Sequence, residues 1–247
     1  MSFSSKKLKA EEDQIGFNTL NLFSIANNYN KWMFTAFASY CSGTTLEIGS
    51  GIGNISKYLL SNIERVTLSD ISDGYCEILH QKFEDVHNLN GIYQIDISAT
   101  NFEETYKALL NKFDTVIALN LIEHIKNDSL AIANCKKLLK SQGRLIILVP
   151  AYQSLYNGLD KMLGHKRRYT KSSLVTQLGS MGLNVIHKQY FNFAGIVGWW
   201  VSGHFLKNKS MKEKQLALFN KLTSVFQLID RLIFYNMGLS VIVISEN

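Results

Sequence analysis

The sequence of 247 residues is poor in proline, in cysteine and in long apolar runs. Its three cysteines, Cys41, Cys76 and Cys135, lie far apart and form no C-x-x-C pair, which argues against a zinc knuckle and against a disulfide framework. Its most apolar stretch, residues 193–206, is bounded by charge and is shorter than the roughly 20 residues of a membrane-spanning helix. We therefore expect reduced core thiols and no membrane span.

A strong excess of one charge is also missing, since 26 Lys and Arg residues against 20 Asp and Glu residues give a net charge of +6. The densest basic clusters are His165–Arg168 and the lysines of residues 207–214. Charge runs of this size are mostly solvated, so we expect no nucleic-acid partner, and we predict no metal site. No basic stretch followed by a long apolar run begins the chain, which predicts a cytoplasmic location.

Short apolar runs alternate with amphipathic stretches through the first two thirds of the sequence. Strands are predicted at residues 45–48, 65–69, 91–95, 113–119 and 144–149, and helices are predicted to begin near residues 53, 73 and 128. This alternation indicates a parallel sheet with helices on both faces. Because the runs 116–119 and 145–149 are almost unbroken, they are expected to be central strands, and Pro150 ends the second one.

The regular alternation is lost beyond Pro150. A helix is predicted at residues 172–181, and strands are predicted at residues 184–190 and 239–245. Between these two strands, residues 193–237 combine a very apolar piece, a basic linker and a segment with helical spacing of apolar residues, which predicts an inserted helical cap. Residues 17–40, near the start of the chain, also show helical recurrence.

Residues 46–53 read Leu-Glu-Ile-Gly-Ser-Gly-Ile-Gly, an apolar run that breaks into three alternate glycines. Glycines permit backbone angles closed to other residues and leave no side chain between the chain and a bound molecule. The dinucleotide fingerprint G-x-G-x-x-G needs a further glycine at the position of Asn54. The turn therefore predicts a ligand site that is not an NAD site.

Polar residues stand at the ends of the next predicted strands. Asp70, Asp96 and Asn120 each follow an apolar run, and ligands of open parallel sheets bind beyond the carboxyl ends of the strands. Asp70 is suited to accept hydrogen bonds from a ribose diol, and Asp96 is suited to bind the amine edge of a purine. Each residue alone is equally well explained as a helix cap or turn former, but the ordered set favours a ligand site.

On these residues the chain resembles the class I S-adenosylmethionine-dependent methyltransferases of the small-molecule type. Residues 47–53 match the first motif E/D-x-G-x-G-x-G, Asp70 matches the ribose-binding acid, and Asp96 with Ile97 matches the adenine-contacting position. Residues 113–125 resemble the fourth motif, and residues 138–145 resemble the turn before the fifth strand. The resemblance covers residues 40–192 and, through the last strand, residues 239–245.

The resemblance implies a Rossmann-like, doubly wound α/β fold with seven strands in the order 3-2-1-4-5-7-6, strand 7 being antiparallel. It implies a methyltransferase domain at residues 41–192 and 238–247, preceded by an arm and helix at residues 1–40 that cover the cofactor site and interrupted by the cap at residues 193–237. The implied cofactor is S-adenosylmethionine, with these binding residues: Glu47, Gly49, Ser50, Gly51, Gly53, Asp70, Ile71, Asp96, Ile97, Asn120, Tyr29 and Trp32. For Tyr29 and Trp32, core packing is the alternative.

Methyl transfer from a sulfonium is an in-line displacement, for which positioning supplies most of the catalysis. We expect a small-molecule acceptor methylated at oxygen, and a base would help to remove the proton of a hydroxyl. His124 and His165 are the candidates for this base, because imidazole titrates near neutral pH. Packing or capping is the alternative for His124. The predicted substrate-binding residues, some suited to an anionic acceptor, are Tyr152, Tyr156, Arg167, Arg168 and Tyr169.

Three further hypotheses follow from the cap and from the fold. The aromatic, apolar cap lines a hydrophobic acceptor pocket, docks a partner subunit in a homodimer, or rests on a membrane surface. The last of these favours a lipid-linked or membrane-associated acceptor. A protein that binds S-adenosylmethionine for regulation without catalysis is the alternative outside the enzymes. Methylation of nucleic acid is not expected, since no Asn/Asp-Pro-Pro-Tyr motif follows the fourth strand.

Overall fold

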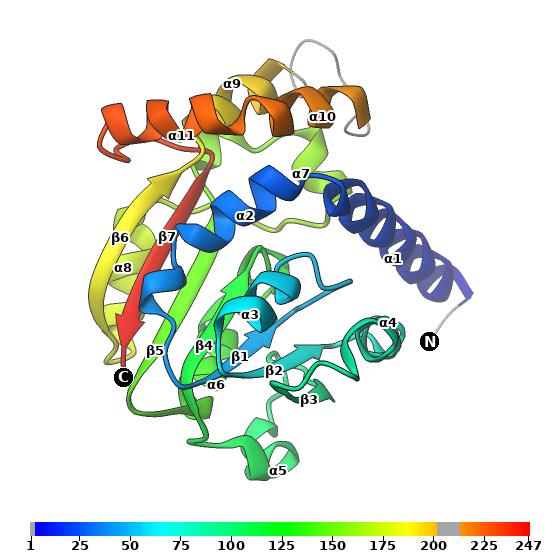
Figure 1. Ribbon diagram of the computed structural model, residues 1–247. Coiled ribbons are helices and arrows are strands. Elements are labelled where there is room, and N and C mark those ends of the chain that lie inside the picture. The colour runs from blue at the N-terminus through cyan, green and yellow to red at the C-terminus, as the bar shows by residue number, and fades with distance from the viewer. Residues whose placement is uncertain (1–2, 202–212) are drawn as a thin grey trace.

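A single mixed sheet forms the centre of the molecule in the computed structural model, which describes residues 3–201 and 213–247 (Figure 1). The strand order is β3-β2-β1-β4-β5-β7-β6. The strands are β1 Thr44–Ile48, β2 Arg65–Asp70, β3 Leu89–Gln94, β4 Phe113–Leu119, β5 Leu139–Pro150, β6 Asn184–Phe191 and β7 Ser240–Glu246. Strands β1 to β5 pair in parallel, whereas β7 is antiparallel to both β5 and β6. The predicted fold class and strand order are confirmed.

Helices cover both faces of this sheet (Figure 1). The α-helices are α1 Phe3–Ser24, α2 Asn27–Thr35, α3 Ser56–Asn62, α4 Asp73–Phe83, α5 Phe102–Thr105, α6 Asp128–Leu138, α7 Gly158–Met162, α8 Lys171–Ser180, α9 Phe193–Trp200, α10 Glu213–Lys221 and α11 Thr223–Leu232. Short 3-10 helices lie at η1 Ala38–Tyr40, η2 Lys107–Leu109, η3 Ile122–His124 and η4 Gln153–Leu155. No helix of the described residues is long and apolar enough to cross a bilayer.

Side chains of the central strands alternate between two cores, one on each face of the sheet. On one face, Val116 of β4 and Leu145 of β5 pack with helices α6 and α8. On the other face, Ile117 and Ile146, the next residues along the same strands, pack with α2, α3 and α4. Successive side chains of a strand point to opposite faces, so a strand buried on both faces must be apolar throughout. This explains the unbroken apolar runs in the sequence.

The N-terminal segment differs from the single helical stretch predicted at residues 17–40. Helix α1 ends at Ser24 and α2 begins at Asn27, so two helices replace one. The side-chain amide of Asn30 donates a hydrogen bond of 2.8 Å to the carbonyl of Phe23. A carbonyl in the last turn of a helix has no partner within that helix, and a side chain of α2 provides one here. The bond stabilises the sharp change of direction between the two helices.

The predicted cap at residues 193–237 is helical where it is described, and its basic linker lies within residues 202–212, outside the described residues. Asp230 of α11 is buried and accepts hydrogen bonds from the backbone N–H groups of Asn192 and Phe193, at 2.7 and 2.9 Å. The side chain of Asn220 in α10 accepts a hydrogen bond of 3.0 Å from the backbone N–H of Tyr29. The cap helices are thus tied to the start of α9 and to α2.

Candidate active site

The glycine turn between β1 and α3 adopts the backbone conformation that the sequence predicts. Gly49, Gly51 and Gly53 have φ angles of 71°, 54° and 83°, a left-handed region that side chains with a Cβ rarely adopt. A Cβ on Gly51 would lie 2.8 Å from Leu20 of α1, and a Cβ on Gly49 would lie 3.1 Å from Leu121. The turn is therefore packed beneath α1 and against the segment that follows β4.

Glu47 and Ser50 brace this turn from below. The Glu47 carboxylate is buried and accepts a hydrogen bond from the Ser56 hydroxyl at the start of α3. The backbone N–H of Ser50 donates to the carbonyl of Ser69 in β2, at 2.8 Å. Burial raises the pKa of Glu47 to about 7, although the hydroxyl hydrogen bonds from Ser56 and Ser50 oppose the shift. Both side chains act on the shape of the turn, and cofactor contact by them stays a prediction.

Asp70 at the end of β2 is linked directly to the glycine turn. Its Oδ2 accepts a hydrogen bond of 2.9 Å from the backbone N–H of Gly51, and its Oδ1 accepts one of 3.0 Å from Ser72. Burial raises the pKa of Asp70, and these backbone donors oppose the rise. The next residue, Ile71, is 57% exposed, so an apolar side chain is available to a ring that binds beside Asp70. Nucleoside binding by Asp70 and Ile71 stays a prediction.

Asp96 and Asn120 lie at the ends of β3 and β4, in the order that the sequence predicts. Oδ1 of Asp96 accepts hydrogen bonds from the backbone N–H and the hydroxyl of Ser98, at 2.8 and 2.6 Å, so the turn-forming alternative describes at least this oxygen. Ile97 is buried in the core. Asn120 has a φ of 49°, and its backbone N–H donates a hydrogen bond of 2.8 Å to the carbonyl of Leu148. Its side chain is exposed at the strand end.

Tyr29 and Trp32 of α2 belong to an aromatic cluster instead of the glycine turn. Both rings pack against Phe191 of the edge strand β6, with centroids 6.0 and 4.4 Å apart, and Tyr29 also packs edge-on against Phe219 of the cap. Their predicted role in cofactor binding is thus not supported, because these contacts account for both rings. The residue of the N-terminal region that lies against the glycine turn is Leu20, which the sequence analysis missed.

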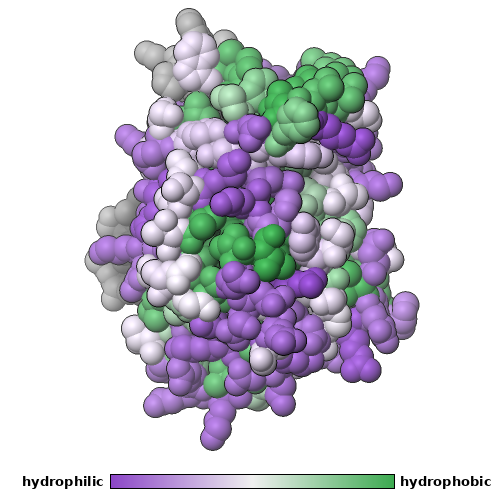
Figure 2. Space-filling model, turned by 90° about the vertical axis from the view of Figure 1, so that its left-hand side faces the viewer, coloured by the Kyte–Doolittle hydropathy of each residue, from purple (hydrophilic) through white to green (hydrophobic). Residues whose placement is uncertain are grey.

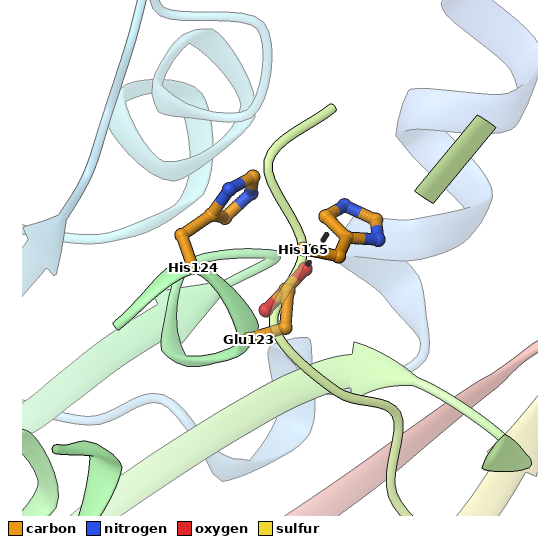
Figure 3. A group of neighbouring side chains, drawn as sticks. All are labelled: Glu123, His124 and His165. Carbon is orange, nitrogen blue, oxygen red and sulfur yellow. Dashed lines mark ion pairs between the residues drawn. The ribbon is translucent and has the colours of Figure 1, made fainter. Parts of the chain in front are cut away.

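Two histidines that are far apart in the sequence meet beyond the carboxyl end of β4. The rings of His124 and His165 lie edge to face with centroids 4.8 Å apart, and Glu123 extends toward them from the same 3-10 helix as His124 (Figure 3). Nε2 of His165 is 4.0 Å from Oε1 of Glu123. The sequence predicted both histidines but missed Glu123, although a carboxylate between Ile122 and His124 just after a strand was a usable signal.

Burial controls the protonation of this cluster. It lowers the pKa of His124 to about 4, with the charges of His165 and Lys166 adding to the effect. It raises the pKa of Glu123 to about 8. The imidazole of His124 is therefore neutral at physiological pH and can accept a hydrogen bond or hold a cation through a ring nitrogen.

Asp160 of α7, which the sequence analysis did not assign to the site, organises the loop that carries His165. One oxygen, Oδ1, lies 2.8 Å from Nδ1 of His165 and accepts a hydrogen bond of 2.8 Å from Nε of Arg168. The other accepts from the backbone N–H of Asn157. Burial opposes the ionisation of Asp160, but these hydrogen bonds outweigh it and lower its pKa. A carboxylate therefore orients the His165 ring.

The substrate role predicted for Arg168 and Tyr169 needs correction, because internal contacts engage their polar atoms. Arg168 is buried, also donates to the carbonyl of Ala151 and lies over the Trp199 ring of α9, with 4.7 Å between the guanidinium carbon and the centroid. The buried Tyr169 donates a hydrogen bond of 2.8 Å to Asp128. We assign both residues to the bracing of the loop.

The other three predicted substrate residues keep some exposure. Arg167 forms an ion pair of 2.7 Å with Asp128, and its side chain is 32% exposed. Tyr156 donates a hydrogen bond of 2.8 Å to the carbonyl of His165. Tyr152 stacks on Tyr190 with centroids 4.9 Å apart. Their substrate contacts stay predictions.

Comparison with known proteins explains why these groups share one edge of the sheet. Residues 46–147, which run from β1 into β5, match the model of a methyltransferase domain. This part of the chain is a methyltransferase domain. A solved S-adenosylmethionine-dependent methyltransferase from Archaeoglobus fulgidus has a TM-score of 0.55 over 88% of this chain and 94% of its own, at 17% identity. That likeness supports the fold of the methyltransferase domain.

Curated relatives resemble only a part of the methyltransferase chain. A highly reducing polyketide synthase of Aspergillus sclerotiorum is 31% identical over 131 residues, which is 48% of this chain and 5% of the synthase. A mitochondrial methyltransferase of Saccharomyces cerevisiae is 28% identical over 171 residues, 64% of this chain and 35% of the yeast protein. The chain thus spans about a third or less of these relatives' length.

The methyltransferase domain fits its cofactor, S-adenosylmethionine. The three left-handed glycines hold a tight turn that has no room for a Cβ, and their backbone groups lie at the carboxyl end of β1, where a ligand of such a sheet binds. Asp70, which is tied to this turn through Gly51, retains acceptor capacity on both oxygens, since each carboxylate oxygen can accept two hydrogen bonds. A cationic sulfonium is also compatible with the buried acids around the turn.

Proposed function

We propose that the protein transfers a methyl group from S-adenosylmethionine to a hydroxyl of a small molecule. The observation that carries this proposal is the pair of imidazoles beyond β4, beside the glycine turn. Leu121, whose side chain would touch a Cβ on Gly49, lies three residues before His124. The glycine turn and the histidines are thus neighbours, as they must be if a methyl group passes between them.

The cofactor contributes a methyl group on a positively charged sulfur, which a nucleophile displaces in line. The protein aligns the acceptor oxygen with this carbon and excludes water, and such positioning is worth several kcal/mol. His124 and His165 act on the acceptor hydroxyl and promote loss of its proton as the new O–C bond forms. On the cofactor side, Asp70 would hold the ribose, Ile71 would pack on the base, and Asp96 and Asn120 would complete the pocket, with Ile97 beneath them in the core.

The rim around the histidines defines the acceptor side of the proposed site. Of the predicted substrate-binding residues, Tyr152, Tyr156 and Arg167 are partly exposed. The guanidinium of Arg168 is engaged by Asp160 and Ala151, and Asp128 compensates the charge of Arg167. An anionic acceptor would therefore depend on the exposed Lys161 and Lys166, and an uncharged hydroxyl compound would need neither. The cytoplasmic location and the division into arm, domain and cap remain predictions.

Calorimetry with the demethylated cofactor, S-adenosylhomocysteine, tests the cofactor half of the proposal. Asp70→Ala should abolish detectable binding, whereas Asp73→Ala, in the exposed first turn of α4, should leave it unchanged. Equal binding by the wild type and Asp70→Ala would exclude the assigned site. Incubation with methyl-labelled cofactor and a panel of hydroxyl compounds then tests transfer. Product with an alkali-stable ether methyl that is lost in His165→Gln supports the proposal, and methylation at nitrogen or carbon would refute O-methylation.

A second candidate, methylation of a membrane-associated acceptor, is favoured by one surface feature of the cap. Apolar side chains gather at the top of the molecule (Figure 2), and those of α10, α11 and the following turn are 38 to 81% exposed. We call this set the cap ridge: Leu218, Leu222, Val225, Leu228, Leu232, Phe234 and Met237. Lys214, Lys221 and Arg231 of the same helices are exposed, which suits an anionic lipid surface.

Flotation with anionic vesicles at low salt tests this candidate. The wild type should float with the vesicles, Leu228→Asp in the cap ridge should not, and Ile186→Asp on the edge strand β6 should float like the wild type. Failure of the wild type to float would exclude the membrane acceptor. If light scattering instead shows a dimer that Leu228→Asp dissociates, the cap ridge is the predicted homodimer interface.

A further inference from the structure

Glu123, His124 and His165 together have the composition and spacing of a metal-binding site. Each offers one ligand atom, a carboxylate oxygen or a ring nitrogen, and these atoms all lie within 4.8 Å of one another. The 4.0 Å between Nε2 of His165 and Oε1 of Glu123 is about twice a metal–ligand bond of 2.0–2.2 Å. An ion can therefore sit between the two donors with little movement of either side chain.

The state of Glu123 points to a missing ligand. Its side chain is fully buried, and neither carboxylate oxygen has a hydrogen-bond partner in another residue that the structure describes. Buried polar groups are normally satisfied, and buried charges are paired or coordinate a metal. The charge of Arg168 acts on Glu123, but this arginine is already paired with Asp160. The side chain of Glu123 thus extends into the cluster with neither oxygen satisfied by any other described residue (Figure 3).

The surroundings of the two histidines supply the support that metal ligands require. Nδ1 of His165 donates to Asp160, which leaves the lone pair on Nε2, the nitrogen that faces Glu123. His124 has a hydrogen bond to the backbone carbonyl of Asn120 through one ring nitrogen, so its other nitrogen is unprotonated. A histidine ligand almost always donates its second N–H to a carboxylate or a carbonyl in this way.

We propose that Glu123, His124 and His165 bind a divalent transition-metal ion such as Zn²⁺. Two imidazoles and one carboxylate form a common catalytic ligand set for zinc, and such a set leaves coordination positions open for an oxygen ligand. Magnesium and calcium prefer sites built entirely from oxygen and are not expected to compete. These ligands come from two segments with no common spacing motif, so the sequence alone does not predict the metal site.

The ion's use, unlike its binding, rests on the proposed function. A hydroxyl that coordinates the ion has a lowered pKa and releases its proton to solvent. The resulting oxygen anion attacks the methyl carbon, so that an O–C bond forms while the S–C bond of the cofactor breaks and its electron pair stays on sulfur. The histidines then promote deprotonation through the ion, and no external oxidant or reductant is needed.

Metal titration of the full chain, stripped with a chelator and free of cofactor and acceptor, tests the site. Cobalt(II) should bind in one equivalent with a visible ligand-field spectrum, and Zn²⁺ should displace it. Glu123→Gln, His124→Gln and His165→Gln should each weaken Zn²⁺ binding by at least about 100-fold in competition with a chromophoric chelator. His187→Gln is the matched histidine control and should bind like the wild type, because His187 lies in β6 and its ring packs on Tyr40 of η1.

The outcomes separate this inference from the proposed function. Circular dichroism establishes that each variant is folded, and if Glu123→Gln does not fold, the two histidine variants decide the result alone. The inference is overturned if the wild type binds no cobalt, or if both histidine variants match His187→Gln. Loss of methyl transfer with intact metal binding would count only against the proposed function, and transfer by a metal-free protein would count only against the use of the ion.

Discussion

Replacement of Arg168 by methionine tests whether this arginine braces the rim loop, residues 152–170, or binds a substrate. The Arg168 and Asp160 side chains are only 1% and 0% exposed, and they form an ion pair of 2.8 Å. The substitution keeps an unbranched apolar side chain against Trp199 but removes the donors to Asp160 and to the carbonyl of Ala151. A buried carboxylate is left with His165 and the backbone of Asn157 as its remaining partners.

Removal of one partner from a buried ion pair costs about 3–5 kcal/mol, because the other charge stays buried without compensation. The two remaining hydrogen bonds of Asp160 place the expected loss near the lower end, at about 3 kcal/mol. The matched control is Arg144→Met. Its ion pair with Glu246 is longer, at 3.8 Å, and both side chains are about a third exposed. Exposed pairs of this kind contribute about 1 kcal/mol or less.

Urea unfolding followed by circular dichroism at pH 7 measures both variants. The hydrogen bonds and the charge of Arg168 lower the pKa of Asp160, so the pair stabilises the protein above the unfolded pKa of about 4 and ceases to do so as pH falls through the folded value. The gap between wild type and Arg168→Met should therefore shrink in acid. If Arg168→Met loses no more stability than Arg144→Met while its KM for the acceptor rises, Arg168 is a substrate-binding residue and its assignment to the bracing of the loop is refuted.

Three other substitutions have expected effects on stability, each measured by urea unfolding. Glu47→Gln should flatten the pH dependence of the free energy of unfolding. Burial raises the folded pKa of Glu47 from 4.5 to about 7, so the wild type loses roughly 3 kcal/mol of stability as pH rises through this window. An unchanged profile would show that Glu47 is not the group responsible. Gly53→Ala should cost roughly 2–4 kcal/mol of stability, since the φ of Gly53 is 83° and the new Cβ would meet Phe83. Gly158→Ala, in open space at the start of α7, should be neutral or stabilising by up to about 1 kcal/mol. Equal effects of the two variants would contradict backbone strain at Gly53. Tyr169→Phe should cost about 1.5–3 kcal/mol through the lost hydrogen bond to Asp128, and a smaller loss would mean that Arg167 alone satisfies this carboxylate.

The sequence predicted best those elements whose signals are local. Helix α4 begins at the expected Asp73 and β4 has the expected bounds Phe113–Leu119, because apolar periodicity and strand-end polar residues are properties of short segments. The seven-strand order came from the family resemblance, since no local pattern states which strands are neighbours. The break between α1 and α2 was missed because it depends on the contact between Asn30 and Phe23.

The acceptor side of the site was harder to predict for the same physical reason. In the sequence, Arg167, Arg168 and Tyr169 form one polar run that is typical of substrate recognition. In the structure, Arg168 and Tyr169 are taken up by Asp160 and Asp128, which lie 8 and 41 residues away in the chain. No spacing rule could assign these partners, because α7 and the fold of the loop create them. Glu123, by contrast, had a visible signal as an acid directly before His124.

The position of His165 depends on contacts from three parts of the chain. The backbone N–H of Lys166 donates a hydrogen bond of 2.8 Å to the carbonyl of Glu123. This bond fixes the rim loop to the segment after β4. Asp160 fixes the ring itself, and Arg168 joins Asp160 to Trp199 of the cap. A change in the cap can therefore alter the geometry at the histidines without touching a reacting atom.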